Sequence, residues 1–416
     1  MPLPLQDREI LRGLARELAD IAALPVQKER AGLWTALNSL QPTRPLIYIN
    51  EIPWDELNVN DELTTRCQDA WARGLEWGMR AQLYQWRHFP GDMVVNPWFW
   101  SPMHIHQTGF GLEIDAAWVA TEGVAVASRE YHGHIKDFSD ADRITTPVVT
   151  HDKAASDAEL ERRTELLGDI MPVKQRGIAG QWFSPWDLLI QVWGVEQAMM
   201  DLVLKPDLVN HVMTRLVDAY MGMLKQWEDQ NLLSPNIYDD RVGSGGYGFT
   251  SELPAKGFDP AHVRTIDLWG CATAQIFVSV SPKMHWEFAL KHEMRWLEKW
   301  GLTYYGCCEP LDIKMGILRR IPNLRKVSMS PWVKPERGAA ELKTDYVYSH
   351  KPNPAILAED VWRPDQARRE LIDVLDRIKG CRVEVILKDV STVRRQPQRL
   401  WEWAKIAAEV VQQYAP

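Results

Sequence analysis

Short apolar runs alternate with longer helical patterns along almost the whole chain. The runs that indicate buried strands are 44–51, Met93–Val95, Ile178–Trp182, Asn236–Tyr238, Ala274–Val278, Leu302–Tyr305, Arg325–Ser328, Tyr346–Ser349 and Val383–Leu387. Helical patterns lie near 60–80, 184–203, 206–230, 281–300, 311–320, 363–379 and 396–413. A strand–helix unit that recurs about eight times, with no linker rich in Pro, Gly or Ser, is typical of one α/β domain. The pattern therefore predicts a (β/α)8 TIM-type barrel over residues 43–416.

Two segments depart from this rhythm. Residues 6–40 carry apolar side chains at helical spacing, so we expect residues 1–42 to form an N-terminal helical extension. Within 111–150, the apolar runs Trp118–Ala120 and Val124–Val126 flank Thr121-Glu122-Gly123. Two such runs around a short turn predict a β-hairpin, inserted in the barrel as a lid or an edge.

The composition argues against several classes of partner. The 416 residues carry a formal net charge of -8, which gives no support for binding to nucleic acid or to an anionic membrane. No run of about 18 apolar residues predicts a membrane span, and the first ten residues lack the pattern of a signal peptide. Five cysteines, an odd number, argue against a disulfide framework. We expect a cytoplasmic protein.

The run Tyr304-Tyr305-Gly306-Cys307-Cys308-Glu309-Pro310 is the strongest chemical signal, because two adjacent cysteines precede a glutamate at the predicted end of a strand. Side chains at such strand ends point into the layer where α/β enzymes do their chemistry. A thiolate beside a carboxylate can bind a soft divalent metal such as zinc, or can act as a nucleophile. The alternative is that one cysteine fills space in the core and the other is inert.

The other predicted strands also end in polar residues. The full set at the strand ends is Asn50, Glu51, Asn96, Gln181, Asp239, Asp240, Arg241, Gln275, Cys307, Cys308, Glu309, Ser328, His350, Lys351, Lys388 and Asp389. In a barrel these side chains would form one ring of acid–base, metal-binding and anion-binding groups. Among them, Asp239 or Asp240 would transfer protons if burial shifted its pKa. The alternative is that both aspartates are solvated.

Histidines and one helical glutamate are further candidates. In an extended segment His104 and His106 share a face, which suits metal ligands or an oxyanion site. Two loop histidines bonded to the backbone would give the same pattern. Glu287 would reach a metal only if its helix folded inward, since an ion pair with Lys291 explains it equally well.

Tryptophan is unusually frequent, at 20 residues, and many of these lie in loops beside proline. Aromatic rings over a barrel mouth would wall a pocket for a flat or apolar ligand. The alternative is that they pack the loops onto the barrel. Trp98, Trp182 and Tyr238 are the aromatic candidates for contact with a substrate.

Several segments together resemble the uroporphyrinogen decarboxylase-like superfamily over roughly residues 40–412. They are Arg44–Ile49, Ser281–Phe288, Cys307–Pro310, Ile321–Trp332, Lys351–Pro354 and Arg399–Ala404. The resemblance implies a (β/α)8 barrel. True decarboxylases of that superfamily carry Met-Arg-Gln-Ala-Gly-Arg after the first strand, and this chain has Asn50-Glu51-Ile52-Pro53-Trp54 there. Decarboxylation of a polyanionic tetrapyrrole is therefore not expected.

The chain is more similar to the corrinoid-linked methyltransferase branch, whose zinc enzymes place a cysteine at the strand end that here gives Cys307 and Cys308. The resemblance matches Cys308 to that zinc ligand. Two other ligand positions of those enzymes fall on Gly306 and near Lys388–Ser391, which supply no histidine or thiol. Cys307, Glu309, His104 or Glu287 would then complete the metal site.

The resemblance implies a methyltransferase that moves a methyl group between a small methylated substrate and a corrinoid or similar acceptor, with activation by zinc. The corrinoid would be carried by a partner protein, and a homodimer is a further expectation. Glu309, Asp239 and Asp240 would be catalytic, and Cys308, Cys307 and Glu287 would bind metal. The residues expected to contact substrate are His104, His106, Trp98, Trp182, Tyr238, Arg241, Gln275, His350 and Lys351.

Two other functions remain open from the residues alone. One is a metal-independent decarboxylase or lyase of a small acid, in which Arg241, His350 and Lys351 would bind a carboxylate. The other is a barrel that binds a ligand without catalysis.

Overall fold

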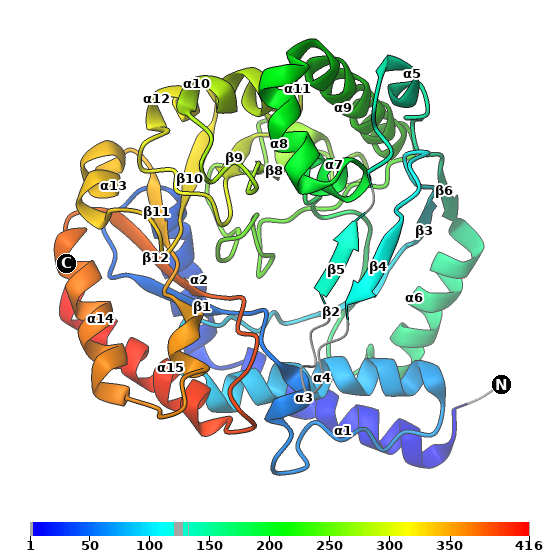
Figure 1. Ribbon diagram of the computed structural model, residues 1–416. Helices are drawn as coiled ribbons and strands as arrows, with labels where there is room; N and C mark the ends of the chain where they lie inside the picture. The colour runs from blue at the N-terminus through cyan, green and yellow to red at the C-terminus, as the bar shows by residue number, and fades with distance from the viewer. Residues whose placement is uncertain (1–2, 120–127, 132, 416) are drawn as a thin grey trace.

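A computed structural model describes residues 3–119, 128–131 and 133–415 of the chain. At its centre lies a six-stranded, wholly parallel sheet with strand order β1-β12-β11-β10-β9-β8. Figure 1 shows this sheet as a curved wall with helices outside it. Its strands are β1 (Leu46–Ile49), β8 (Trp269–Ala272), β9 (Leu302–Tyr305), β10 (Leu324–Met329), β11 (Val347–His350) and β12 (Arg382–Leu387).

These strands are buried along nearly their whole length, and most of their residues are apolar, as in Leu302-Thr303-Tyr304-Tyr305, although β10 and β12 also carry charged residues. Strands that are covered on both faces read as continuous apolar runs rather than as an alternating pattern. That property explains why the sequence located β1, β9, β10, β11 and β12 to within two residues at each end.

A closed barrel is not confirmed. The described residues form no ladder strand at Met93–Val95, Ile178–Trp182, Asn236–Tyr238 or Ala274–Val278, and β8 instead precedes the last of these segments. Here a single parallel bridge joins Ile178 to Leu233. The Asn236 side chain donates to the backbone C=O of Trp269 and accepts from its N–H, at 2.9 Å each. The segment that contains Asn236 is therefore joined to β8 by a side chain and not by a backbone ladder. Gly180 and Pro235 interrupt the apolar runs, which disfavours a regular ladder in these segments.

Three two-stranded sheets lie outside the central one. The pair β2 (Phe99–Pro102) and β7 (Val173–Arg176) is parallel, and β3 (His104–Gln107) with β6 (Val149–Asp152) is antiparallel. The hairpin expected within 111–150 is confirmed as β4 (Ala116–Val119) and β5 (Ser128–Tyr131). Its second strand lies beyond Val124–Val126, a run outside the described residues.

The α-helices are α1 (Leu5–Ala22), α2 (Pro25–Asn38), α3 (Trp54–Leu57), α4 (Ala70–His88), α5 (Phe138–Ala141), α6 (Lys153–Leu167), α7 (Pro185–Trp193), α8 (Val195–Leu204), α9 (Pro206–Asp229), α10 (Pro282–His285), α11 (Lys291–Leu297), α12 (Met315–Leu318), α13 (Pro335–Leu342), α14 (Pro364–Arg377) and α15 (Gln398–Val411). Shorter 3-10 turns lie at η1 (Thr265–Asp267), η3 (Pro354–Leu357) and η4 (Gln412–Tyr414), and a π-turn lies at η2 (Trp286–Leu290). None of the described helices is both long and apolar enough to cross a membrane.

The N-terminal residues form the two helices α1 and α2, which break at Pro25. The helix α1 packs against α4 in an apolar cluster that includes Leu11 and Leu83. The helix α2 contacts the central sheet, because its Trp34 and Leu37 pack in one buried cluster with Leu46 of β1 and Val347 of β11. Trp34 also donates from Nε1 to the carbonyl of Asp92 at 2.8 Å.

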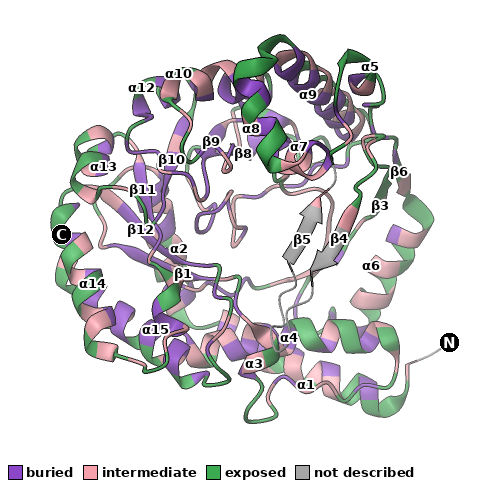
Figure 2. Ribbon diagram, in the orientation of Figure 1, coloured by how far each residue is buried: buried purple, intermediate pink, exposed green. Residues whose placement is uncertain are grey.

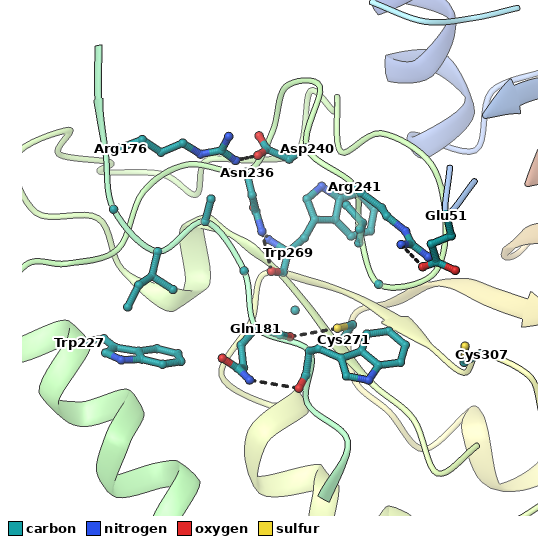
Figure 3. A pocket seen from close by; sticks show the side chains of 18 of the residues that line it. Glu51, Arg176, Gln181, Trp227, Asn236, Asp240, Arg241, Trp269, Cys271 and Cys307 are labelled. Carbon is teal, nitrogen blue, oxygen red and sulfur yellow. Dashed lines mark hydrogen bonds and ion pairs between the residues drawn. The ribbon is translucent and has the colours of Figure 1, made fainter. Parts of the chain in front are cut away.

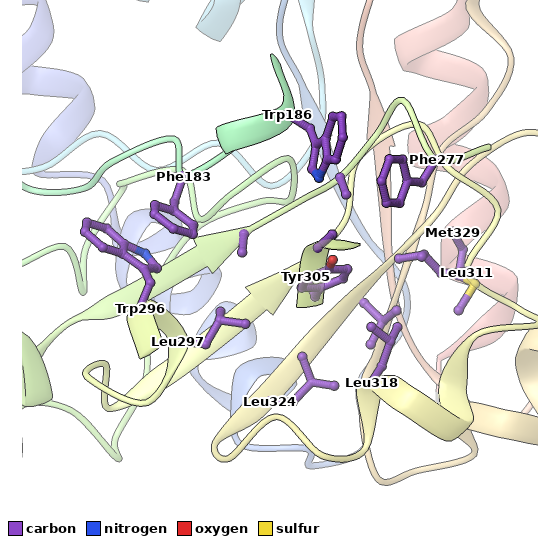
Figure 4. Packing of buried hydrophobic residues seen from close by; sticks show 14 of the residues in the cluster. Phe183, Trp186, Phe277, Trp296, Leu297, Tyr305, Leu311, Leu318, Leu324 and Met329 are labelled. Carbon is purple, nitrogen blue, oxygen red and sulfur yellow. The ribbon is translucent and has the colours of Figure 1, made fainter. Parts of the chain in front are cut away.

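Many tryptophans belong to the core, among them Trp186 and Trp296 (Figure 4), and the strands of the central sheet are mostly buried (Figure 2). Trp296 stacks on Phe183 with ring centres 4.5 Å apart, and Trp186 lies 4.7 Å from Phe277. Trp186 follows Pro185 in sequence and is fully buried. The sequence placed Trp186 in a loop, but it lies in the first turn of α7, where the structure favours packing over ligand contact.

A buried ion pair spans the inner face of the sheet. Lys326 on β10 donates to Glu384 on β12 at 2.8 Å, and neither side chain is exposed. The same lysine also donates to the carbonyl of Tyr247 at 3.3 Å, while Glu384 accepts from the N–H of Gly246 at 3.3 Å. These bonds join the loop 240–248 to the strands and offset the cost of burying two charges.

We expect Lys326→Met to lower the free energy of unfolding by about 3–5 kcal/mol, because Glu384 would remain buried without its cation. Urea denaturation measures this change. The double substitution Lys326→Met/Glu384→Gln should recover most of the loss, and Arg377→Ala, in an exposed ion pair, serves as the control. Equal stability of the single and double variants would contradict the prediction.

Candidate functional site

A cavity of about 1050 Å³ opens at the carboxyl ends of β1, β8, β9 and β12. Figure 3 shows its side chains converging from several segments. From the strand ends come Glu51, Arg176, Cys271, Cys307, Cys308, Lys388 and Asp389, and from the loops between strands come Gln181, Trp182, Asn236, Asp240, Arg241, Val242 and Gln275. The strand-end candidates of the sequence therefore supply much of this wall.

The turn that follows β9 orients the two thiols. Gly306 has a φ of 99°, and a Cβ there would lie 2.3 Å from Leu311, so only glycine fits this position without strain. The Glu309 carboxylate accepts the Cys307 N–H at 2.9 Å, and Ser328 Oγ donates to the Cys307 carbonyl at 2.6 Å. Both backbone groups of Cys307 are thus fixed, and both thiols line the cavity.

Cys307 lies in a cationic environment. Its Sγ is 3.4 Å from Sγ of Cys308 and 3.5 Å from Nζ of Lys388. The hydrogen bond from Cys308 and the positive charge of Lys388 lower the pKa of the Cys307 thiol, although burial opposes them. The same hydrogen bond, together with burial, raises the pKa of Cys308. The two shifts run in opposite directions, so Cys307 is the more acidic thiol of the pair.

Carboxylates surround the cations of this wall. Lys388 contacts Asp389 at 2.6 Å and Glu51 at 3.2 Å, and Arg241 contacts Glu51 at 2.5 Å. Burial opposes ionisation of Glu51, but Arg241, Asp389 and Lys388 bring its pKa down to about 2. Burial and the hydrogen bond to Glu51 raise the pKa of Asp389. The two carboxyls thus shift in opposite directions, and Asp389 is the less acidic of the pair.

A second ion pair forms the opposite part of the wall. Arg176, at the end of β7, pairs with Asp240, which is nearly buried and has one carboxylate oxygen without a hydrogen-bond partner. The neighbouring Asp239 bonds to Asn96, and burial raises its pKa to about 6. Of the two aspartates predicted to transfer protons, Asp240 lines the cavity and Asp239 lies behind it in a smaller pocket with Trp98.

The residues around the thiols do not fit a zinc ion. Zinc sites use at least three protein ligands. Among the residues that the structure describes, no three His, Cys, Asp or Glu side chains are grouped so as to hold a metal. The group that approaches Cys307 besides Cys308 is the ammonium of Lys388, which would repel a second cation. The site thus supplies two thiols and one fixed positive charge.

The other metal candidates lie elsewhere. Glu287 is half exposed on η2, where it pairs with Lys291 and accepts from Asn210 at 3.3 Å. His104 and His106 are exposed on β3, while Ile105 and Gln107 of the same strand line the cavity. Because side chains alternate along a strand, the two histidines lie on the face of β3 opposite to the cavity. The structure does not bring any of these three to Cys308.

Glu309 is not a member of the cavity wall either. It is fully buried, and its oxygens accept from Thr273 Oγ1 at 3.0 Å and from the Cys307 N–H at 2.9 Å. His350 and Lys351 are buried as well, and Lys351 donates to the Tyr304 hydroxyl at 2.7 Å. These three predicted residues support the site from behind the wall.

The remaining substrate candidates divide into two groups. Trp182 and Gln275 line the cavity, and both donate to the Asp187 carboxylate, at 3.1 and 2.7 Å. Trp98 and Tyr238 pack against each other with ring centres 5.1 Å apart and lie outside the cavity lining. Arg241 lines the cavity but is already paired with Glu51.

Sequence reasoning missed several wall residues. Arg176 and Gln107 belong to short strands of the outer sheets that the apolar pattern did not reveal. Cys271 was missed because the sequence placed this strand at Ala274–Val278, a few residues too late. The signal that could have found Cys271 is the apolar run Leu268–Ala272, which precedes the expected strand.

A chain of buried polar groups lies behind the strand that carries the thiols. Lys314 Nζ is 3.0 Å from His285 Nδ1, and His285 Nε2 is 2.7 Å from the Tyr305 hydroxyl, which donates to Glu293 at 2.7 Å. Burial raises the pKa of Glu293 to about 8 and lowers that of Lys314 to about 8. Burial also lowers the pKa of His285 well below its usual range. These bonds hold Tyr305, the last residue of β9, directly before the turn.

The methyltransferase from Methanosarcina mazei is similar to this chain in structure. The two superpose with a TM-score of 0.53 over 92% of this chain and 98% of that chain, at 12% sequence identity. This likeness shows that the two proteins share an α/β fold. No protein-family model matches the chain, and no curated protein matches it.

We expect Glu293→Gln to remove a pH dependence of stability. The pKa of Glu293 rises from an ordinary value of 4.5 to about 8 on folding, so the proton is bound more tightly in the folded state. Its contribution is complete below pH 4.5 and is lost as the pH rises through about 8. The loss is on the order of 4 kcal/mol. Urea denaturation at pH 5, 7 and 9 measures it as a difference between wild type and variant, and a difference that stays constant with pH would contradict it.

Proposed function

We propose that the protein is a methyltransferase that moves a methyl group between a small methylated substrate and a corrinoid or similar acceptor. The observation that carries the proposal is the thiol pair Cys307 and Cys308, which faces a large cavity beside the Lys388 ammonium. A thiolate is a strong nucleophile toward a methyl carbon. The fold shared with the methyltransferase from Methanosarcina mazei supports the same class of reaction.

The size of the cavity supports a reaction with two partners. Its volume of about 1050 Å³ exceeds what a small methylated compound fills. Trp182, Gln181 and Gln275 supply an aromatic surface and polar side chains along one part of the wall. A substrate bound there would leave room for the reactive face of an acceptor presented at the mouth. The proposal includes no zinc ion, because the side chains around the thiols do not fit one.

The cations expected of a small-acid decarboxylase or lyase are engaged by the protein. Arg241 is paired with Glu51, and Lys351 is buried against Tyr304 and Ser349. A substrate carboxylate would have to displace these partners, which lowers the net gain of binding. This arrangement favours the methyltransferase over the lyase.

We expect the wild-type protein to transfer a methyl group from at least one member of a panel of O-, N- and S-methyl compounds to chemically reduced cobalamin. Formation of methylcobalamin, followed by absorbance, measures the transfer. The double variant Cys307→Ala/Cys308→Ala should fall to the rate without protein, because both thiols are removed. The control Cys381→Ser lies outside the cavity and should keep the wild-type rate. A wild-type protein that methylates no cobalamin with any compound of the panel would contradict the proposal.

A further inference from the structure

We infer that Cys307 itself takes the methyl group, as S-methylcysteine, and passes it on to the acceptor, with Lys388 and Cys308 as the groups that activate its sulfur. This inference rests on the proposed function and specifies the atom through which the methyl group travels. It concerns Cys307 rather than Cys308, the cysteine that the resemblance matched to a zinc ligand.

The contacts of the two sulfurs distinguish the two residues. Sγ of Cys307 has two donors, Nζ of Lys388 at 3.5 Å and the thiol of Cys308 at 3.4 Å. Both donors stabilise negative charge on Cys307. Cys308 receives no such contact from Lys388, and it keeps its proton in order to donate. Cys307 is therefore the nucleophile and Cys308 is its hydrogen-bond donor.

The position of Cys307 suits attack on a bound substrate. Its N–H and C=O are both fixed, by Glu309 and Ser328, and its sulfur contacts Lys388 and Cys308, so the backbone and the thiol are both held before a substrate enters. The residue is 4% exposed overall, yet it lines the cavity. A nucleophile that is held rigidly at a cavity wall loses little entropy when it reacts.

The transfer needs no external oxidant or reductant. In the first step a lone pair of the Cys307 thiolate forms the S–C bond, and the bond between the methyl carbon and the substrate heteroatom breaks. That heteroatom keeps the bonding pair and takes a proton from water, which leaves as hydroxide. In the second step the acceptor's electron pair bonds to the methyl carbon, and the S–C pair returns to sulfur, which restores the thiolate.

The second step explains why Cys307 needs two donors. A thioether gives up its alkyl group only if the departing thiolate is stabilised, and a thiolate of lower basicity leaves faster. Lys388 and Cys308 stabilise the departing charge in the geometry that they have before the reaction. The donor and the acceptor can then occupy the cavity in turn, which predicts ping-pong kinetics.

The first test compares cysteines within one protein. With iodoacetamide at pH 7.5, peptide mapping should show Cys307 alkylated at least about tenfold faster than Cys381, which is the more exposed of the two. Burial raises the pKa of Cys381 to about 11, so it reports the rate of an unactivated thiol. Lys388→Met should slow Cys307 about tenfold and leave Cys381 unchanged, and Lys388→Arg should restore part of the rate. Equal rates at the two cysteines, or no effect of Lys388→Met, would overturn the inference.

The second test follows the methyl group itself. Iodomethane should add one methyl group to Cys307, read as a mass gain on that peptide, and reduced cobalamin should then remove it and restore the free thiol. A methyl group that stays on Cys307 would overturn the relay. Cys307→Ser should abolish transfer to cobalamin, whereas Cys308→Ser, which keeps a hydroxyl donor, should retain part of it. Transfer that persists in Cys307→Ser would refute the inference and leave the proposed methyltransferase standing, whereas failure of the wild type with every donor refutes the function.

Discussion

The buried carboxylate of Glu309 is the interaction on which the geometry of the site depends. It bonds the N–H of Cys307 in the turn after β9 and the hydroxyl of Thr273, which directly follows β8. A buried carboxylate is tolerated when it has such partners, and here the partners belong to two different strand ends. Glu309 therefore ties the thiol turn to the neighbouring strand. Its position next to the cysteines suggested a catalytic acid, but a fully buried group with both oxygens engaged is a positioning residue.

The charges of the cavity wall constrain what the cavity can bind. Each cation of the wall has a carboxylate partner: Arg176 has Asp240, Arg241 has Glu51, and Lys388 has Asp389 and Glu51. A polyanionic ligand would have to break these pairs and leave carboxylates beside its own charges, which is unfavourable. The wall thus gives a physical reason, independent of the missing arginines after the first strand, to disfavour a porphyrinogen. A small ligand with little charge fits better.

The sequence predicted one half of the fold far better than the other. Strands β1 and β9 are nearly continuous apolar runs, and β10, β11 and β12 keep enough apolar residues for the pattern to be visible without a structure. At Ile178 and Asn236, neighbouring segments are joined by one β-bridge and by side-chain hydrogen bonds. Such links produce no regular spacing of apolar residues, so the sequence does not reveal them. The closed barrel was expected because apolar runs were counted as strands, although an apolar run indicates burial rather than backbone pairing. Among the described residues, β1 and β8 are the edges of the central sheet, and closure is not confirmed.

The site shows the same division. Strand-end reasoning located the thiols, Arg241 and Lys388, because residues after parallel strands must meet at one edge. It could not show which face of β3 lines the cavity, because adjacent residues of a strand point to opposite faces. As a result Gln107, and not its neighbour His106, lines the cavity. Burial could not be read from residue type either. Lysine is a residue type that usually lies at the surface, but the structure buries Lys351 against Tyr304.

A metal ion and the Lys388 ammonium are alternative solutions to one problem, the stabilisation of a thiolate in a partly buried wall. At about 4 Å and an effective dielectric constant of 20, two unit charges interact by about 4 kcal/mol, and a divalent ion would roughly double this repulsion. Lys388 is held in place by Asp389 and Glu51, so its withdrawal would break both ion pairs. In this wall the fixed cation beside the sulfur is therefore an ammonium. The consequence is chemical: a zinc ion can activate the substrate's heteroatom, whereas an ammonium beside sulfur activates the sulfur, both as nucleophile and as leaving group.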